Sequence, residues 1–174
     1  MNLQTPKRQV FYSFHYDKDC WRTQIVRNIG AIEGNQQASS NEWETLKRTG
    51  ENAVRRWIDN NLRYRSCTIV LIGEETYSRP FVLYEIRKSW ELKKGVFGIY
   101  VHGLKDKNEM AANKGKNPFL YASIPRMRFP STEIDAYDAG YILGSYSPYK
   151  YIENNISTWI ENAINKRASW VPLF

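Results

Sequence analysis

Two short apolar runs, SCTIVLIG at 66–73 and VFGIYV at 96–101, constrain the fold of this chain more than any other feature. Both are almost continuously apolar and rich in β-branched residues, which is typical of strands buried on both faces of a parallel sheet. The segment between them predicts a helix over about 79–94, opened by Pro80 and ended by Gly95. A strand, a helix and a second strand in this order predict a parallel pair joined by a right-handed crossover.

The rest of the chain continues the alternation of strands and helices. A β-rich run at 8–14 predicts a first strand. Apolar side chains recur at helical spacing over about 18–29, 51–63 and 149–167, so each of these segments is predicted to be an amphipathic helix. We therefore expect an α/β fold, a flavodoxin-like three-layer sandwich with a central, mostly parallel sheet, and a single domain over 1–174.

Three segments carry no such periodic pattern. The stretch 30–50 is polar and rich in Gly, Ser and Asn, so we expect a long loop that holds at most a degenerate strand. The stretch 102–119 is predicted to be a second polar loop. The stretch 120–145 gives weak strand signals among turns, and we assign no definite element to it.

Composition argues against several classes of protein. No apolar run approaches the ~20 residues that a membrane-spanning helix needs. The first residues, MNLQTPKRQV, lack the apolar centre of a secretory signal. Cys20 and Cys67 stand far apart and show neither metal-binding nor redox spacing, so each is expected to be a small buried hydrophobe in a reducing cytoplasm.

The formal net charge of +7 indicates either an anionic partner or simply a solvated basic surface. The candidate partners are nucleic acid, a membrane surface and a phosphate-bearing small molecule. Basic residues are scattered in pairs rather than clustered on one helix, which argues against nucleic acid. Nucleic-acid binding through such a surface would weaken steeply with salt.

Glu85 is the residue of the 79–94 helix that is best placed for chemistry. It interrupts an apolar and aromatic run and lies beside the face formed by Val82 and Ile86, which should pack on the sheet. In a parallel sheet, ligands bind outside the carboxyl ends of the strands, and Glu85 is only about one and a half helical turns from that edge. The alternative is an ordinary solvated glutamate that pairs with Lys88.

Two segments should meet at the same edge of the sheet. Ser13, Phe14 and His15 end the first strand, and Thr76 and Tyr77 follow the buried run that begins at position 66. Other familiar chemistries lack their motifs, because the chain has no Gly-rich phosphate loop, no GxSxG elbow and no Cys/His cluster for zinc. No metal is therefore expected.

Several of these segments together resemble a known family. They are VFYSFHYDKD, EWETLKRTG, CTIVLIGEETYSRPFVLYEIRKSWELKKGVFGIYVHGLKDK and KNPF, in this order. They are similar to the TIR-like domain of bacterial antiphage defence, above all to the TIR-domain protein of the Thoeris system. The resemblance covers about 8–120, so that 121–174 is expected to be a C-terminal elaboration with a final helix.

The resemblance implies a flavodoxin-like fold and an enzyme that cleaves NAD, with NAD as substrate and no cofactor. The family's catalytic glutamate, on the helix after the third strand, corresponds to Glu85. The family's nucleotide-binding edge and the loop before its catalytic helix correspond to Ser13, Phe14, His15, Thr76 and Tyr77. This chain departs from the wider TIR family because it has no clear second strand and lacks the usual loop after it.

The resemblance also implies partners. In the Thoeris relatives the ADP-ribose part of NAD is cyclised into a diffusible signal for a separate effector protein. A phage-derived activator and self-association of the chain are further expectations of the same kind.

A single carboxylate suits this chemistry. Nicotinamide leaves as a neutral ring, so the group that needs stabilising is the positive charge that builds on the ribose, as in other oxocarbenium-like transition states. A charge in a water-poor crevice acts more strongly than one in water. Phe14, Tyr77 and Trp43 are candidates for stacking on adenine or nicotinamide, with core packing as the alternative, and Arg79 is a candidate phosphate contact. Water as acceptor gives ADP-ribose, whereas a group of the same molecule gives a cyclic nucleotide.

A second hypothesis belongs to a different class. Many TIR domains act as scaffolds, so the chain is alternatively a non-catalytic module that assembles with other TIR domains or with an adaptor. Assembly that survives loss of Glu85, without NAD turnover, would favour this alternative.

Overall fold

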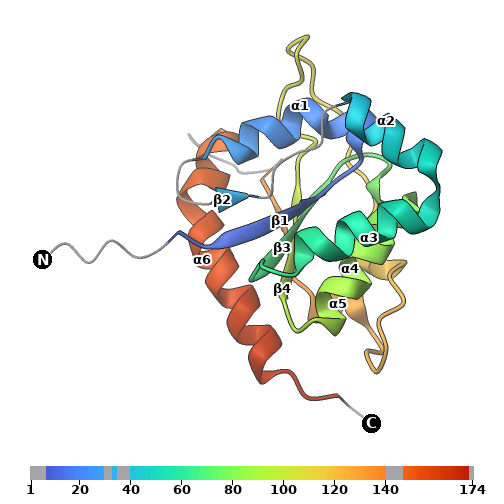
Figure 1. Ribbon diagram of the computed structural model, residues 1–174. Coiled ribbons are helices and arrows are strands. Elements are labelled where there is room, and N and C mark those ends of the chain that lie inside the picture. The colour runs from blue at the N-terminus through green and yellow to red at the C-terminus, as the bar shows by residue number, and fades with distance from the viewer. Residues whose placement is uncertain (1–6, 30–32, 35–39, 140–146, 173–174) are drawn as a thin grey trace, which may run out of the picture.

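The computed structural model describes residues 7–29, 33–34, 40–139 and 147–172 and contains a sheet in which every neighbouring pair of strands is parallel (Figure 1). The strands lie in the order β2-β1-β3-β4-β5. Their bounds are β1 (Gln9–Ser13), β2 (Glu33–Gly34), β3 (Cys67–Ile72), β4 (Gly95–Tyr100) and β5 (Ala136–Asp138). This is the order of flavodoxin-like sheets, so the expected α/β class with a central parallel sheet is confirmed.

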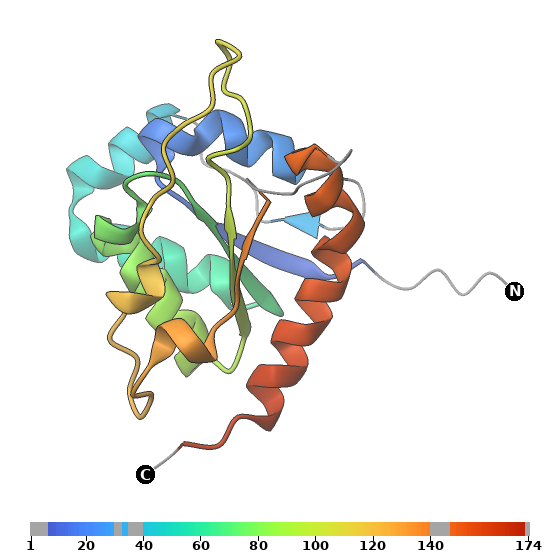
Figure 2. The ribbon, with the colours of Figure 1, turned by 180° about the vertical axis from the view of Figure 1, so that it is seen from behind.

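Helices cover both faces of the sheet, which gives the three layers (Figures 1 and 2). One face packs against α1 and α6, and the other packs against α3 and α4. The helices are α1 (Tyr16–Arg27), α2 (Ser40–Thr49), α3 (Glu51–Leu62), α4 (Pro80–Glu91), α5 (Pro130–Glu133) and α6 (Pro148–Ser169). Two 3-10 turns, η1 (Thr76–Ser78) and η2 (Pro118–Leu120), lie in the loops that follow β3 and β4.

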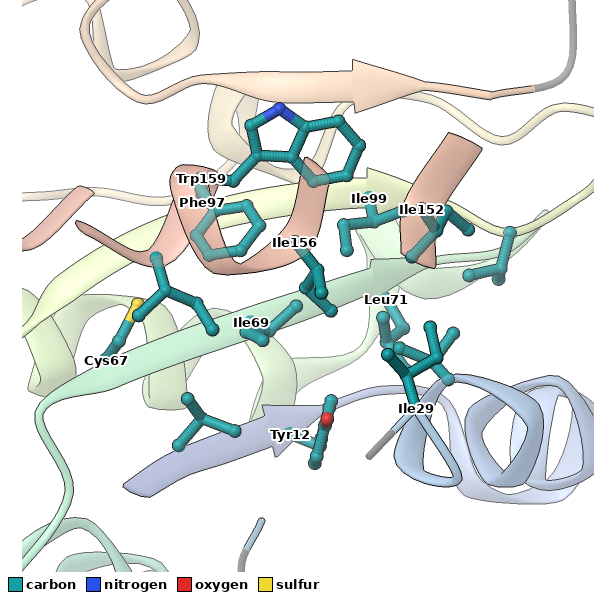
Figure 3. Packing of buried hydrophobic residues seen from close by; sticks show 14 of the residues in the cluster. Tyr12, Ile29, Cys67, Ile69, Leu71, Phe97, Ile99, Ile152, Ile156 and Trp159 are labelled. Carbon is teal, nitrogen blue, oxygen red and sulfur yellow. The ribbon is translucent and has the colours of Figure 1, made fainter. Parts of the chain in front are cut away.

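The central strand β3 is apolar throughout because its two faces are both buried. Ile69 and Leu71 belong to the cluster on the α6 side, where Ile156 and Trp159 lie over the sheet (Figure 3). Val70 belongs to the cluster on the α4 side. Each fully buried aliphatic side chain of this kind contributes about 1.5–3 kcal/mol relative to an exposed one, so the continuous run of apolar residues specifies a central strand.

The structure differs from the sequence prediction in the stretch 30–50. Its second half is the helix α2, where a loop was expected, so that part of the prediction was wrong. The physical reason is tertiary burial, because Trp43 and Leu46 pack against the cluster that α3 forms with Phe11 of β1. The degenerate strand that the prediction allowed is present as the two-residue β2, whereas 30–32 and 35–39 lie outside the described residues.

The remaining loops follow the sequence more closely. The chain from 102 to 117 has no helix or strand and projects beyond the carboxyl edge of the sheet (Figure 2). The weak strand signal in 120–145 corresponds to β5 at the edge of the sheet, and 140–145 lies outside the described residues. None of the described helices is long and apolar enough to cross a membrane.

The sequence predicted that Gly95 ends the helix α4, but in the structure Gly95 belongs to β4. The helix α4 ends at Glu91, and Lys93 takes the left-handed conformation, with a φ of 59°, that turns the chain. Gly95 is the first residue of β4, where the backbone of α6 approaches the strand closely. A Cβ atom at position 95 would lie 2.7 Å from the backbone nitrogen of Ile164. The glycine therefore allows α6 to pack on the sheet.

We expect Gly95→Ala to lower the free energy of unfolding by about 1–3 kcal/mol, because the added methyl group meets backbone that cannot rotate away. Urea unfolding measures the loss. Gly98→Ala is the matched control, since the nearest atom to its added Cβ would be the end of the Ile72 side chain, at 2.6 Å. An equal or larger loss at position 98 would contradict this account.

Candidate active site

A cavity of about 240 Å³ opens at the carboxyl edge of the sheet. It lies beside β1, whose neighbours in the sheet are β2 and β3, so it occupies the position where the strand order reverses. Four segments line it: the β1–α1 junction, α2, the start of α4 and the second turn of α4. The lining residues are Phe14, His15, Tyr16, Asp17, Trp43, Lys47, Arg79, Pro80, Phe81, Val82 and Glu85.

Glu85 is the only carboxylate in this lining that is buried. Its residue is 6% exposed, whereas the side chain of Asp17 is 65% exposed. The Ser13 hydroxyl, from the end of β1, donates a hydrogen bond to Oε2 of Glu85. Burial raises the pKa of Glu85 to about 8, and the Ser13 hydrogen bond acts against that rise. Glu85 has no ion-pair partner among the described residues. The alternative of a solvated glutamate that pairs with Lys88 is therefore wrong.

The backbone that carries Glu85 is fixed to the sheet. The Ser89 hydroxyl, one helical turn further on, donates to the carbonyl oxygen of Glu85 at 2.6 Å. The same hydroxyl pairs with the Thr68 hydroxyl of β3, with 2.7 Å between the two oxygens. Val82 and Ile86 pack beside this contact in the apolar cluster between α4 and the sheet. The carboxylate therefore projects from a rigid turn rather than from a mobile loop.

Aromatic rings form one wall of the cavity. Phe14 and Tyr16 are stacked with their ring centroids 6.0 Å apart, and Tyr16 and Trp43 are stacked at 5.9 Å. Phe81 meets Trp43 edge to face at 6.2 Å. Three rings in succession, with 27° and 25° between neighbouring planes, present apolar surface beside a buried carboxylate. This surface suits a ligand with a planar ring and a developing positive charge.

Cationic groups stand at the mouth of the same cavity. Arg79 donates a hydrogen bond to Oε2 of Glu75, and Lys18 bonds the other oxygen of Glu75 at 2.6 Å. Lys47 reaches the mouth from α2. The His15 imidazole is buried beside them, and burial followed by the charge of Arg79 lowers its pKa, so the ring is neutral at pH 7.

The structure brings together most of the residues that the sequence singled out. The cavity lining includes four of them, Phe14, His15, Trp43 and Glu85. Ser13 is not in the lining but donates a hydrogen bond to the Glu85 carboxylate. Phe14 also packs against the core, and Trp43 also packs on α3, so both rings combine the functional placement with core packing.

Thr76 and Tyr77 lie outside this lining. Thr76 is buried, and its hydroxyl accepts a hydrogen bond from the Gly73 backbone at 2.9 Å, which holds the loop after β3. The Tyr77 ring faces Tyr121, with the centroids 5.1 Å apart, and Lys116 lies over it. A direct contact of either residue with substrate stays a prediction.

Sequence reasoning assigned no contact with a ligand to six of the lining residues, which are Tyr16, Asp17, Lys47, Pro80, Phe81 and Val82. Lys47 was missed because its segment was expected to be a loop. A signal was present, because SSNE at 39–42 places an acidic residue three positions after a serine, as in a helix capping box, just before an apolar pair at helical spacing. No group of three His, Cys, Asp or Glu side chains suited to a metal occurs in the described part of the chain.

Two comparisons with known proteins bear on this site. The family model "Thoeris protein ThsB, TIR-like domain" matches residues 11–106, which include every residue of the cavity lining. A protein of Bacillus cereus (strain MSX-D12) with the name "Putative cyclic ADP-D-ribose synthase ThsB1" is 40% identical over 119 residues. That match covers 66% of this chain and 62% of the relative, so it spans less than two thirds of the relative's length.

The raised pKa of Glu85 predicts how stability depends on pH. The folded protein binds this proton more tightly than the unfolded chain does, with a pKa of about 8 against 4.5, so burial of Glu85 lowers the free energy of unfolding as pH rises between those values. Glu85→Gln removes this loss. We expect the variant to gain on the order of a few kcal/mol over wild type at pH 8.5, at about 1.4 kcal/mol per pKa unit, and much less at pH 5.

Urea unfolding of both proteins at several pH values measures this difference. Asp19, whose pKa burial raises to about 6, is present in both proteins and cancels. A gain that does not change with pH would contradict the burial of an ionisable Glu85.

Proposed function

The chain belongs to the Thoeris ThsB family with a TIR-like domain, and we propose that it is an enzyme that consumes NAD. In this proposal it cleaves the bond between nicotinamide and ribose and closes the ADP-ribose part into a cyclic nucleotide. The observation that carries the proposal is the buried carboxylate of Glu85, which has no ion-pair partner among the described residues, in a cavity at the switch point of the sheet. The name of the Bacillus cereus relative supports the cyclisation.

The proposed cleavage moves a positive charge from the nicotinamide ring to the ribose. As the C1′–N bond breaks, its electron pair neutralises the positive nicotinamide nitrogen and leaves a positive charge shared by C1′ and the ring oxygen of the ribose. A carboxylate fixed in a cavity stabilises that charge without having to reorganise. Glu85 provides this group, because Ser13 and the turn around Ser89 hold it in place.

The raised pKa of Glu85 is compatible with this task. At pH 7 the carboxyl group of the free protein is largely protonated, since its pKa is about 8. A substrate that already carries a positive nicotinamide ring favours the ionised form when it binds nearby. A group with a pKa close to the working pH is also suited to accept the proton that the attacking hydroxyl or amino group of the acceptor releases.

The size of the cavity supports partial burial of the substrate. Its volume of about 240 Å³ lies below the ~300–1,000 Å³ of sites that enclose whole drug-sized ligands, so it has room for the nicotinamide and its ribose but not for the complete dinucleotide. The adenosine half must then lie outside, where Tyr16 and Trp43 offer stacking surface. A dinucleotide folded against this wall brings its own adenine close to C1′, which is the geometry that cyclisation requires.

The competing reaction is hydrolysis. Water at C1′ gives linear ADP-ribose, and an adenine nitrogen or ribose hydroxyl of the same molecule gives a cyclic product. The aromatic wall disfavours water next to C1′, which supports the cyclic product. The alternative of a non-catalytic TIR scaffold gives no reason for burying a carboxylate at a cost in stability.

The family context extends the proposal to partners. We propose that the cyclic nucleotide diffuses to a separate effector protein, that a phage-derived component activates the enzyme, and that the system serves antiviral defence. Self-association of the chain fits a cavity that encloses only part of its substrate.

Loss of the Glu85 charge should remove turnover. We expect Glu85→Gln to lower the rate of nicotinamide release by at least about 100-fold, as is usual when a fixed electrostatic stabiliser is lost, while the fold is retained. Glu91→Gln is the matched control, because Glu91 lies on the same helix with its side chain 43% exposed and should leave turnover unchanged.

Chromatography of the products formed from NAD, with and without extract of phage-infected cells, measures release and separates linear from cyclic ADP-ribose. Full release by Glu85→Gln, or none by wild type in the presence of the activating extract, would contradict the proposal.

Ser13 should set the pH range in which the enzyme works. If ionised Glu85 is the active form, kcat/KM of wild type rises with pH towards a plateau above about 8. Ser13→Ala removes the hydrogen bond that favours the ionised form, so we expect this rise to move to higher pH by up to about one unit. Ser89→Ala is the control, because its hydroxyl bonds the Glu85 carbonyl and not the carboxylate. A rise at the same pH in Ser13→Ala would show that Ser13 does not act through Glu85.

A further inference from the structure

The N-terminus of α4 borders the cavity, next to the ion pair between Arg79 and Glu75. Pro80 has no N–H group, and the N–H groups of Phe81 and Val82 have no acceptor within the described residues; Leu83 is the first to bond backward, to the Arg79 carbonyl at 3.0 Å. The first turn holds no acidic side chain. The positive end of the helix dipole and two unused donors are therefore directed toward the space that Pro80, Phe81 and Val82 line.

A second and independent observation concerns His15. Its side chain is only 9% exposed, it lines the same cavity, and its Nδ1 atom has no hydrogen-bond partner. The nearest carboxylate oxygen, on Glu75, is 4.0 Å from Nδ1, which is too far for a hydrogen bond. A buried imidazole nitrogen without a partner costs free energy unless a ligand completes it, and a neutral imidazole can donate from this atom.

Arg79 adds a fixed positive charge at the same end. Its Nη2 group is bonded to Glu75, which orients the guanidinium group, while its Nε atom is buried and has no partner. A guanidinium group held in this way has donors in a fork that matches the oxygens of a phosphate group. Lys47 of α2 also lines the cavity, and its ammonium group pairs with Glu44 at 2.6 Å.

We infer that the N-terminus of α4, together with His15 and Arg79, is a subsite for the diphosphate group of the substrate. This inference rests on the proposed function, because it divides the same cavity between two parts of one dinucleotide. The positive end of α4 takes the diphosphate, and Glu85 on the next turn takes the ribose that loses nicotinamide.

The spacing along α4 fits this division. Phe81 and Glu85 are four residues apart, which is about 6 Å along a helix that rises about 1.5 Å per residue. In a dinucleotide only the sugar ring and its 5′-methylene separate C1′ from the first phosphate. One helix can therefore contact the phosphate with its first turn and the sugar with its second. Binding energy from the diphosphate, which does not react, then holds the reacting sugar against Glu85.

The inference predicts which fragments of the substrate bind. ADP-ribose carries the diphosphate and should bind well, whereas nicotinamide riboside has the reacting sugar without any phosphate and should bind weakly. Inorganic pyrophosphate should compete with ADP-ribose. Fluorescence of Trp43, which lines the cavity, together with isothermal titration calorimetry, reports on binding without any turnover.

The test uses titrations of the full chain with ADP-ribose and with nicotinamide riboside. Arg79→Gln should weaken ADP-ribose about tenfold or more, the usual effect of losing a charge-assisted hydrogen bond, and change nicotinamide riboside less than about twofold. Arg87→Gln is the matched control, because it also removes one arginine charge, from a side chain that is 39% exposed against 38% for Arg79. Arg87 lies outside the cavity lining and pairs with Glu91. This control should leave both affinities unchanged.

A second variant separates ligand binding from a structural effect. Glu75 neutralises Arg79 and Lys18, so Glu75→Gln leaves more positive charge at the mouth. ADP-ribose should bind Glu75→Gln at least as tightly as wild type if these cations contact the diphosphate. Weaker binding would mean that the ion pairs only support the loop, and would overturn the inference.

The outcomes for the subsite and for the enzyme are distinct. If wild type releases nicotinamide but ADP-ribose binds Arg79→Gln as tightly as wild type, the diphosphate subsite is wrong and the enzymatic proposal stands. If wild type never turns over NAD but binds ADP-ribose in a manner that depends on Arg79, the enzymatic proposal is wrong and the subsite stands. Failure of ADP-ribose to bind wild type at all would overturn the subsite.

Discussion

The hydrogen bond from Ser13 to Glu85 is the contact on which the organisation of this protein depends. It joins the end of β1 to the second turn of α4 and is the interaction that stabilises the charged form of a carboxyl group buried among apolar side chains. One hydroxyl does not replace the hydration that the carboxylate loses, and so the pKa of Glu85 remains near 8. The remainder of the fold holds these two elements at this separation, because apolar clusters pack α4 on one face of the sheet and α6 on the other.

In the proposed reaction, attraction to the cationic sugar offsets the free energy that is needed to ionise Glu85 in the cavity. Ionising a carboxyl group of pKa about 8 at pH 7 costs about 1.4 kcal/mol, which is one pKa unit. A unit positive charge 4 Å away attracts a carboxylate by about 1 kcal/mol in water and by about 4 kcal/mol at the effective dielectric constant near a protein surface. The buried position therefore gains about 3 kcal/mol in attraction to a cationic sugar. If the proposal is correct, this gain is of the same order as the stability that burial of Glu85 costs at neutral pH.

Much of the fold could be predicted from the sequence because local hydrophobic patterns determine its strands and helices. Runs such as 66–73 must be buried on both faces, and the helices between them bury one face each, so the parallel sheet follows from residue types alone. The helix α2 could not be predicted in the same way, because its apolar side chains are buried by contacts with α3 that its own sequence does not reveal. The position of Glu85 in the site was predictable for a different reason, because a single charge in an apolar run is informative. Its partner Ser13 is 72 residues away, and only the packing of α4 on the sheet brings the two together.

The cavity has opposite character at its two ends, and this polarity follows from the direction of one helix. The first turn of α4 offers unused N–H groups, with the Arg79 guanidinium beside them, and the second turn offers a carboxylate. A ligand that is anionic at one end and becomes cationic at the other fits this axis in only one orientation. Reversing it would bring the anionic part to Glu85 and the developing cation to Arg79, and both contacts would be repulsive. In the proposed complex, electrostatics therefore favours one orientation of the substrate, and the aromatic wall is left to position the remaining ring.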